Sequence, residues 1–203
     1  MDVIRIIRKR MNIRKVGHAG TLDPLATGVL LVCLGTATKK IEQLMGQSKE
    51  YEAEINLSAF TETDDAESEP IIQEIKSIPT CTEINSALQS FVGNIQQIPP
   101  KYSALLINGV RAYKKAARGD QFEMKPRPVE IYGIQILNYS WPLLTIKVQC
   151  GKGTYIRSLA RDIGLKLGTG GYLTQLIRTS IGNFTLQNAV NPHEIKPEQL
   201  ITL

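Results

Sequence analysis

The sequence predicts an α+β fold in which helices flank a mixed, largely antiparallel sheet. Segments that alternate polar and apolar residues, as strands do, interleave with segments of helical spacing, but the regular spacing of βαβ units is absent. The chain contains no internal repeat and no low-complexity tract. Its 203 residues, 42% of them hydrophobic, suffice for a substantial core. We therefore expect a single domain over residues 1–203.

The first part of the chain predicts a helix, a loop, a strand and a second helix. Apolar residues at helical spacing from Val3 to Met11 predict an amphipathic helix with a basic opposite face. A glycine-rich loop over residues 17–28 follows, and the apolar run at residues 29–34 is typical of a buried strand. Residues 36–45 predict a second helix, which ends at a glycine.

The next part predicts a strand, a loop and a helix. Strict alternation over residues 50–57 indicates a half-buried strand with Tyr51 on its inward face. Residues 61–70 are acidic and polar, so they predict a surface loop. Thr82 can cap the following helix, which ends at Gly93.

The second half of the chain predicts a hairpin, three helices and two strands. Residues 107–110 carry the Asn-Gly signal of a tight hairpin, and residues 111–118 predict a short basic helix. Two runs of strand character, at residues 129–137 and 143–150, flank a Trp-Pro turn. Thr154 is expected to cap the helix that follows GKGTY and carries one apolar stripe, and a last helix is expected before Leu203.

Charge is distributed unevenly along the chain. The total of 24 basic against 19 acidic residues gives only +5. Basic residues concentrate at positions 1–15 and 101–127, and acidic residues concentrate at positions 42–74. This segregation fits two basic surfaces that hold a phosphate backbone, with the acidic stretch kept away from it. On charge alone, ordinary solvated faces fit the pattern equally well.

Composition excludes several classes of protein. Three cysteines without a C-x-x-C pair and only two histidines make a disulfide framework or a zinc site implausible. No apolar run approaches the length of a membrane span, and the N-terminus lacks the features of a secretory signal. We therefore expect a cytoplasmic protein without metal or membrane partner.

The densest local signal is the loop at residues 17–28, GHAGTLDPLATG, which holds the single carboxylate of Asp23 among three glycines and a proline. Glycines allow a substrate to approach the backbone closely. On composition alone, however, an ordinary Asp-Pro turn fits better, because turns are built from these residue types.

A resemblance decides between these alternatives. The segment GHAGTLDPLATGVLLVCLGTATK resembles the signature of the bacterial tRNA pseudouridine-55 synthases, the TruB family. The resemblance continues in family order through KEYEAEI, TETDD, IPPKYSALLINGVRAY, AARG, GKGTYIRSLARDIGLKLG and LIRTSIGNF, and so covers nearly the whole chain. PLATGVL resembles the stand-alone bacterial type rather than the guide-RNA-dependent type. The implied fold is that of the pseudouridine synthases.

The resemblance implies an activity. A member of this family isomerises one uridine in the T arm of tRNA to pseudouridine after the nucleotide leaves its stack, with no cofactor and no metal. The implied partner is tRNA, and we expect the protein to act as a monomer. Chemistry at the sugar C1′ calls for a carboxylate that traps or offsets oxocarbenium-like charge, which agrees with Asp23 in this role.

The resemblance also implies the catalytic residues. Asp23 is the implied catalyst, Arg157 its ion-pair partner, and Tyr51 the aromatic residue that stacks on the extracted base. Without the family match, Arg157 would be read as an ordinary helix-surface arginine and Tyr51 as a core tyrosine.

Further residues are implied to bind the substrate. His18 aligns with a histidine that wedges into the T loop, and Leu176 with an apolar residue under the base, although both also fit ordinary core positions. Residues 101–127 resemble an insertion that clamps the T stem. The residues expected to position the RNA are Lys9, Arg14, Lys15, Tyr102, Arg111, Lys114 and Lys115.

The ends of the sequence depart from the family pattern. Members usually carry a strand and a K-P-x-G-x-T-S loop before the first helix and often a small RNA-binding domain at the other end, and neither is present here. We therefore expect an N-terminally incomplete catalytic domain. A second function class stays open, namely a tRNA-binding or RNA-folding module with weak catalysis. A glycoside hydrolase is disfavoured, because no motif supplies the second carboxylate.

Overall fold

The computed structural model describes residues 2–201, and its centre is a seven-stranded sheet. One parallel pair, between β2 and β12, joins a sheet whose other neighbours are antiparallel. The predicted mixed, largely antiparallel α+β fold is confirmed. The strands in sheet order are β13 (Phe184–Thr185), β12 (Tyr172–Ile181), β4 (Lys49–Asn56), β11 (Leu143–Cys150), β10 (Arg127–Ser140) and β7 (Gly93–Gln97), with β2 (Ala26–Gly28) beside β12.

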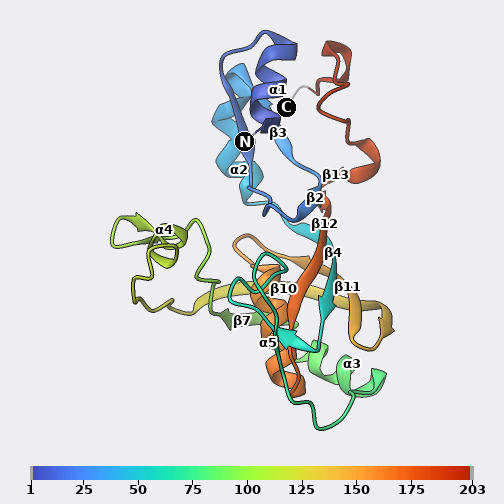
Figure 1. Cartoon of the computed structure of the whole chain (residues 1–203). Coiled ribbons are helices and arrows are strands. Elements are labelled where there is room, and N and C mark those ends of the chain that lie inside the picture. Colours follow the sequence, from blue (N-terminus) through green and yellow to red (C-terminus); the bar gives the residue numbers. More distant parts are fainter. Residues whose placement is uncertain (1, 202–203) are drawn as a thin grey trace.

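Strand β4 lies in the middle of this sheet, with β11 on one side and β12 on the other. Its alternation agrees with the sequence prediction: Ala53 and Ile55 are fully buried, and Tyr51 is half-buried on the same face. Figure 1 shows β4 and β12 running side by side through the centre of the molecule. Segments far apart in the sequence therefore meet along these two strands.

Two helices cover one face of the sheet. The apolar residues of α3 (Cys81–Gln89) and α5 (Ile156–Leu167) belong to the same core cluster as those of the central strands. The end of α5 packs directly on backbone, since a Cβ added at Gly164 would lie 2.2 Å from the carbonyl oxygen of Gly170. This packing fixes α5, and with it the arginines that α5 carries, relative to the sheet.

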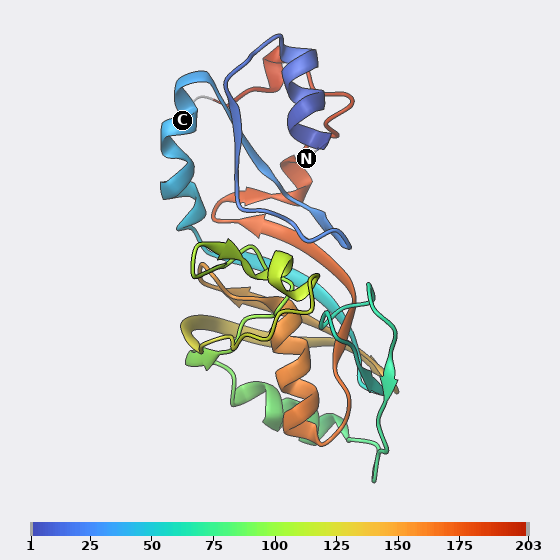
Figure 2. The same cartoon turned by 60° about the vertical axis from the view of Figure 1, so that its left-hand side comes forward.

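A smaller part of the molecule lies at one end of β4 and β12, at the top of Figure 1. It contains α1 (Asp2–Met11), β1 (Val16–Ala19), β3 (Leu31–Leu34), the 3-10 helix η1 (Gly35–Lys40) and α2 (Ile41–Met45). Its own apolar cluster is built around Ala19, Cys33 and Leu44. In Figure 2 the C-terminal segment, with η2 (Leu186–Asn188) and η3 (Pro197–Gln199), lies beside α1.

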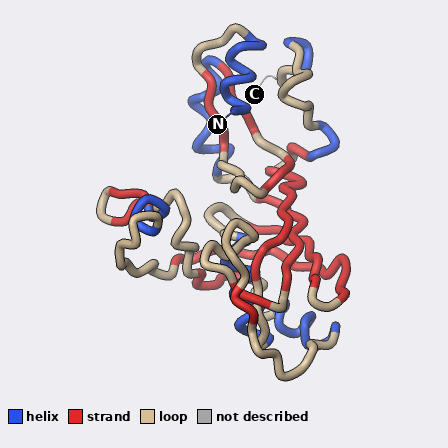
Figure 3. Tube along the Cα trace, in the orientation of Figure 1, coloured by secondary structure: helices blue, strands red, loops and turns tan. Residues whose placement is uncertain are grey.

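The segment at residues 101–127 projects away from the sheet (Figures 1 and 3). It holds a hairpin of β8 (Leu106–Ile107) and β9 (Val110–Arg111), followed by α4 (Ala112–Ala116). The predicted tight turn is confirmed, with left-handed backbone at Asn108 (φ 51°) and Gly109 (φ 80°). The rest of this segment is loop in Figure 3.

The prediction of a surface loop at residues 61–70 is wrong for its first half. This segment lies after the short strand β5 (Ala59–Phe60), and β6 (Ile71–Ile72) pairs with that strand. Thr61, Thr63, Asp64 and Asp65 are buried. The cause is tertiary: the amide of Leu173 donates to the carbonyl of Asp64 at 3.1 Å, and both carboxylates meet arginines of α5.

Both predicted helix caps are wrong. Thr80, not Thr82, caps α3, because the Glu83 carboxylate returns to the Thr80 amide at 2.7 Å and completes a capping box. Helix α5 begins after Tyr155, and the hydroxyl of Thr154 instead donates to the carbonyl of Gly151 at 3.2 Å.

The predicted buried strand at residues 29–34 is also only partly correct. Strand β3 begins at Leu31, and within residues 29–34 only Val29 and Cys33 are buried. The remaining side chains of that run are half-buried because β3 pairs with β1 alone. None of the helices between residues 2 and 201 has both the length and the apolar character that a bilayer crossing requires.

Candidate active site

Asp23 and Arg157 form a two-point ion pair, although they are 134 positions apart in the chain. The Nε of Arg157 donates to Oδ2 of Asp23 and its Nη2 donates to Oδ1, both at 3.0 Å. Asp23 lies in the loop between β1 and β2, where the amide of Ala26 donates to its carbonyl and closes a turn. Two parallel hydrogen bonds fix the plane of the carboxylate as well as its position.

The two partners differ sharply in exposure. The side chain of Arg157 is 6% exposed, whereas that of Asp23 is 32% exposed. The guanidinium also donates to the carbonyls of Thr63, at 3.1 Å, and Tyr102, at 3.0 Å. These acceptors offset the cost of burying its charge. The pair therefore presents a carboxylate that remains partly open to solvent and is backed by a fixed cation.

Asp65 is a third member of this centre that the sequence interpretation missed. It is fully buried, and its Oδ2 lies 3.5 Å from Nε of Arg157 without a hydrogen-bond partner of its own. Its Oδ1 accepts from the hydroxyl of Thr63 and the amide of Glu67. Arg157 is thus held between two carboxylates. The TETDD motif was the signal, but its acidity led to the expectation of an exposed loop.

A second ion pair lies one helical turn along α5. The Nη1 of Arg161 donates to Oδ2 of Asp64 at 2.8 Å, and its Nη2 donates to Asp162 at 2.9 Å. Burial raises the pKa of Asp64 to about 6, and the charges of Arg161 and Arg157 oppose this rise. Residues four apart on a helix share one face, so Asp64 and Asp65 meet two arginines of the same helix.

Tyr51 and Leu176 lie on adjacent strands beside Asp23. Leu176 pairs with Ala53 of β4, two positions from Tyr51, and it is buried in the main core cluster. Tyr51 and Leu25 pack against that cluster from outside. Burial raises the pKa of Tyr51, the charge of Arg178 lowers it, and the charge of Asp23 contributes a smaller rise. The structure therefore brings four predicted site residues together: Asp23, Tyr51, Arg157 and Leu176.

Tyr155 is a second tyrosine near the pair that the sequence interpretation did not assign. Its amide donates to Oε1 of Gln97 at 2.9 Å, and its carbonyl accepts from Nε2 of Gln97 at 3.1 Å. Burial raises the pKa of Tyr155, the charge of Asp23 adds to this rise, and the charge of Arg157 opposes it. Gln97 is 1% exposed, so it fixes the backbone immediately before Arg157.

His18 lies in β1 opposite Val32, five positions before Asp23. It is half-buried, and its Nδ1 has no hydrogen-bond partner in the described part of the chain. No hydrogen bond connects it to the Asp23–Arg157 pair within residues 2–201. Its assignment to the RNA interface stays a prediction.

The predicted RNA-positioning residues lie at the surface, but not all of them are free. Lys9, Arg14, Lys15 and Lys114 are exposed. Three others are engaged within the protein. The guanidinium of Arg111 donates to the carbonyl of Ala104, Lys115 pairs with Asp120 at 3.9 Å, and the hydroxyl of Tyr102 donates to Glu62 at 3.3 Å. The contact of all seven with RNA stays a prediction.

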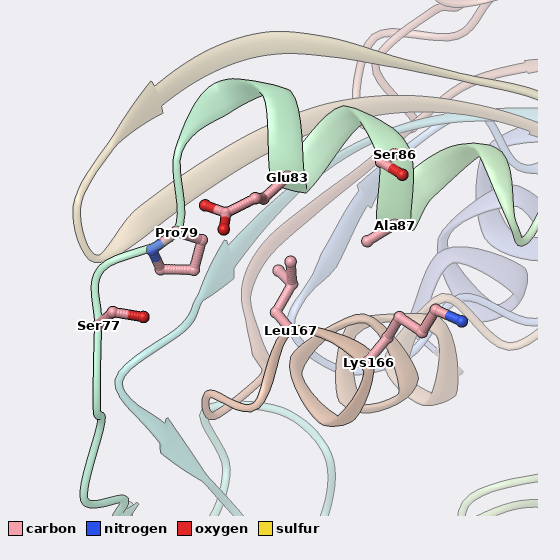
Figure 4. Close-up of a pocket in the computed structure, with 7 residues that line it drawn as sticks. All are labelled: Ser77, Pro79, Glu83, Ser86, Ala87, Lys166 and Leu167. Carbon is pink, nitrogen blue, oxygen red and sulfur yellow. The ribbon is translucent and has the colours of Figure 1, made fainter.

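Two cavities lie outside this centre. One of about 490 Å³ lies beside the Asp64–Arg161 pair, with Ile98, Phe122 and Met124 among the residues that line it. The other, of about 300 Å³, lies between α3 and the end of α5 (Figure 4). Between residues 2 and 201 the structure contains no cluster of three or more His, Cys, Asp or Glu residues that could hold a metal.

Two family models together match nearly the whole chain. Residues 8–156 match the model described as TruB family pseudouridylate synthase (N terminal domain), and residues 157–202 match the tRNA pseudouridylate synthase B C-terminal domain. The boundary between them falls immediately before Arg157. Even so, β12 from the second region pairs with β4 from the first, and the Asp23–Arg157 ion pair joins the two regions.

Similar proteins carry the corresponding name. The chain is 46% identical over 199 residues to tRNA pseudouridine synthase B of Clostridium tetani (strain Massachusetts / E88). The aligned residues make up 98% of this chain and 69% of that protein. The chain is 47% identical over 186 residues to tRNA pseudouridine synthase B of Bacteroides fragilis (strain YCH46), which covers 91% and 80%.

Solved structures agree in fold. A Cbf5-Nop10-Gar1 complex matches with a TM-score of 0.69 and 31% identity, covering 90% of this chain and 45% of that chain. An H/ACA RNP bound to a substrate RNA containing 2'-deoxyuridine matches with a TM-score of 0.69 and 28% identity, covering 95% and 47%. The chain thus spans less than half of the structures it matches. Since a family model covers residues 8–156 and a relative is 46% identical over 98% of this chain, the chain belongs to the TruB family of pseudouridylate synthases.

Proposed function

We propose that the chain carries the catalytic centre of a tRNA pseudouridine synthase that isomerises a uridine in the T arm. The observation that carries this proposal is the partly exposed carboxylate of Asp23 held at two points by the buried guanidinium of Arg157. The two charge-assisted hydrogen bonds hold this carboxylate in one orientation. A carboxylate so oriented can meet positive charge as it develops at a ribose C1′.

The reaction is a rearrangement within one nucleotide. The bond between N1 of uracil and C1′ breaks, the base turns, and C5 bonds to C1′. The hydrogen on C5 leaves as a proton and N1 gains one, so no atom is added overall and neither a redox partner nor a metal is needed. Asp23 stabilises the sugar after the first bond breaks, through charge or a covalent adduct, and both routes use the same oxygen.

The side chains beside Asp23 suit a base removed from its stack. Leu176 belongs to the main core cluster, and Tyr51 and Leu25 pack against that cluster. Removal from the stack costs a few kcal/mol, which contacts with these apolar groups help to recover. The ordinary pKa of a tyrosine, 10.0, lies well above neutral pH and burial raises that of Tyr51 further, so Tyr51 can stack without introducing a charge.

RNA binding is assigned to the exposed basic residues and to the insertion at residues 101–127. Structured RNA is read largely through shape and backbone, which suits charges displayed on a projecting segment. Relatives named tRNA pseudouridine synthase B and a structural neighbour bound to a substrate RNA support an RNA substrate for this chain. We place the site in one catalytic domain over residues 1–203 and expect a monomer acting in the cytoplasm.

The test compares wild type with Asp23→Asn on an unmodified T-arm stem-loop. Wild type should form pseudouridine, and Asp23→Asn should form none while its RNA affinity stays within a few-fold of wild type. A variant rate within tenfold of wild type would remove Asp23 from its role. Equal, negligible turnover by both proteins with retained RNA binding would indicate an RNA-binding module instead.

A further inference from the structure

Arg178 is the largest fully buried side chain in the part of the chain that the structure describes, at 1% exposure. It lies on β12, two positions after Leu176. Its guanidinium donates to three main-chain carbonyls: Nε to Val29 at 2.7 Å, Nη2 to Gly20 at 3.2 Å and Nη1 to Thr21 at 3.3 Å. Sequence analysis did not assign it any role.

In the sequence, those three carbonyls lie on both sides of Asp23. Gly20 and Thr21 precede the carboxylate, and Val29 follows the turn and the short strand β2. The main chain of Arg178 holds the same loop, since its carbonyl accepts from the amide of Val29 at 2.8 Å. One residue therefore holds both ends of the loop at residues 20–29.

Gly28 makes this close approach possible. It pairs with Arg178 in parallel register, and a Cβ added to it would lie 2.2 Å from the carbonyl oxygen of Arg178. Its backbone is also in the left-handed region, with φ 104°. The backbone of the loop thus lies directly against β12, within reach of the guanidinium.

The charge of Arg178 has no carboxylate partner. Within residues 2–201, no Asp or Glu oxygen lies within ion-pair distance of its guanidinium. A buried cation is costly unless dipoles or opposite charges surround it, and here carbonyl dipoles do so. Replacement of the guanidinium by an apolar group would leave three carbonyls without their donors.

Arg178 also reaches the second catalytic residue. It pairs in register with Tyr51 on β4, so the two residues lie opposite each other on neighbouring strands. The same cation opposes the rise in the pKa of Tyr51 that burial causes.

We propose that Arg178 is a positioning residue whose single guanidinium holds the Asp23 loop against the pair of strands that carries Tyr51, so that Asp23 and Tyr51 face the same nucleotide. The proposal rests on the function proposed above. At 1% exposure Arg178 does not touch RNA, so its effect on the reaction passes through Asp23 and Tyr51. Its loss should therefore slow the chemical step and leave RNA affinity unchanged.

The main test is Arg178→Lys. A lysine carries one nitrogen and cannot span carbonyls on both sides of the loop, so the loop loses part of its support. We expect kcat to fall about 100-fold, the loss that a displacement of about 1 Å causes, with KM and the RNA dissociation constant within twofold. Ile177→Val, at the neighbouring position of the same strand, is the matched control and should leave all three unchanged. An unchanged kcat, or a loss confined to RNA binding, overturns the proposal.

Hydrogen exchange separates this proposal from the proposed function. In Arg178→Lys, the amides of residues 20–29 should exchange at least tenfold faster, whereas those of β4 and β11 should not change. In Tyr51→Phe the loop amides should stay protected. Faster exchange of the loop amides in Arg178→Lys alone supports the positioning role even if wild type shows no turnover. Absence of turnover would refute the proposed function but not the positioning role. Unchanged exchange in the loop overturns the positioning role.

A measurement on wild type covers the case in which Arg178→Lys does not fold. Three hydrogen bonds should stop rotation of the guanidinium, so NMR of the arginine side chains should resolve its Nη hydrogens and show cross-peaks to the ring of Tyr51. A single averaged signal that exchanges rapidly with water would overturn the proposal without any variant.

Discussion

The centre around Arg157 and the insertion at residues 101–127 are built on opposite principles. At the centre, Arg157 and Asp65 are buried, and Arg157 alone contacts two carboxylates and two carbonyls. In the insertion, most side chains are exposed, and its basic residues have few partners. Strands β8 and β9 contain two residues each, and α4 contains five.

This contrast indicates how the two regions work. Buried charges in a low dielectric keep one geometry, because any displacement leaves a charge without compensation. Exposed charges at the end of a projecting segment can adapt to a phosphate backbone, and each contributes little by itself. Changes at the centre should therefore affect turnover and stability, and changes in the insertion should affect RNA affinity and its salt dependence.

The largest effect is expected from Asp65→Asn. The amide would keep an oxygen for Thr63 and Glu67 but remove the charge that Arg157 shares, and it would place a donor against Nε. Loss of one partner of a buried ion pair should lower the free energy of unfolding by about 3 kcal/mol. Turnover should fall about 100-fold, because Arg157 no longer holds Asp23 in one position.

Chemical denaturation and turnover on a T-arm stem-loop measure these two effects. Glu67→Gln is the matched control. The side chain of Glu67 is exposed in the same loop, and this residue contacts Asp65 through its main-chain amide. It should change neither quantity. Turnover of Asp65→Asn within twofold of wild type would mean that Asp23 alone suffices to hold Arg157.

A smaller effect, in stability alone, is expected from the pH dependence of Asp64. Burial raises its pKa from 3.8 to about 6 in the folded state. Between these values the folded protein holds a proton that the unfolded chain has released, so this group makes stability fall as pH rises through the window.

Comparison with Asp64→Asn isolates this contribution. The unfolding free energy of wild type minus that of the variant should decrease by about 1 to 3 kcal/mol between about pH 3.5 and pH 7. Urea denaturation at several pH values measures the difference. A difference that is constant, or that grows with pH, would show that the Asp64–Arg161 pair does not keep the carboxyl in a desolvated site.

The smallest effect is expected from the lysines of the insertion. Lys114 is exposed and has no carboxylate within ion-pair distance among residues 2–201, whereas Lys115 pairs with Asp120. Lys114→Ala should reduce the slope of log affinity against log salt by about 0.7 to 0.9, the value for one phosphate contact. Lys115→Ala should reduce it less, because its charge is already partly compensated.

Binding of a T-arm stem-loop at several salt concentrations measures the slopes, and kcat at saturating RNA should not change. If a variant that carries both Lys114→Ala and Lys115→Ala keeps the wild-type slope, α4 does not contact phosphate. If instead kcat falls while the slope is unchanged, the contrast between the two regions is wrong.

Local pattern was sufficient for several elements of the fold, although β7 and β12 of the central sheet were not predicted. The alternation around Ala53 and Ile55, the helical stripe of α5 and the Asn-Gly hairpin all depend on neighbours within a few residues, so their prediction did not require the tertiary structure. The helix caps failed for a local reason, since the reciprocal pair of Thr80 and Glu83 competes with any cap at Thr82.

The candidate site divides in the same way. The loop around Asp23 and the residues Arg157, Tyr51 and Leu176 could be named from the sequence because motifs carry them. Asp65 could not, because acidity predicts exposure, and its neutralising partner follows more than 90 positions later. Arg178 was missed for a related reason: its partners are main-chain carbonyls, which no residue type reveals.

The amino-acid sequence by itself therefore determined the family resemblance, the fold class and the carboxylate that we propose as the reacting one, since these depend on residue types and short spacings. Only the tertiary structure decided which charges are buried. The free energy of a buried charge depends on the groups that surround it in space, and here those groups come from a loop, a helix and a strand far apart in the chain.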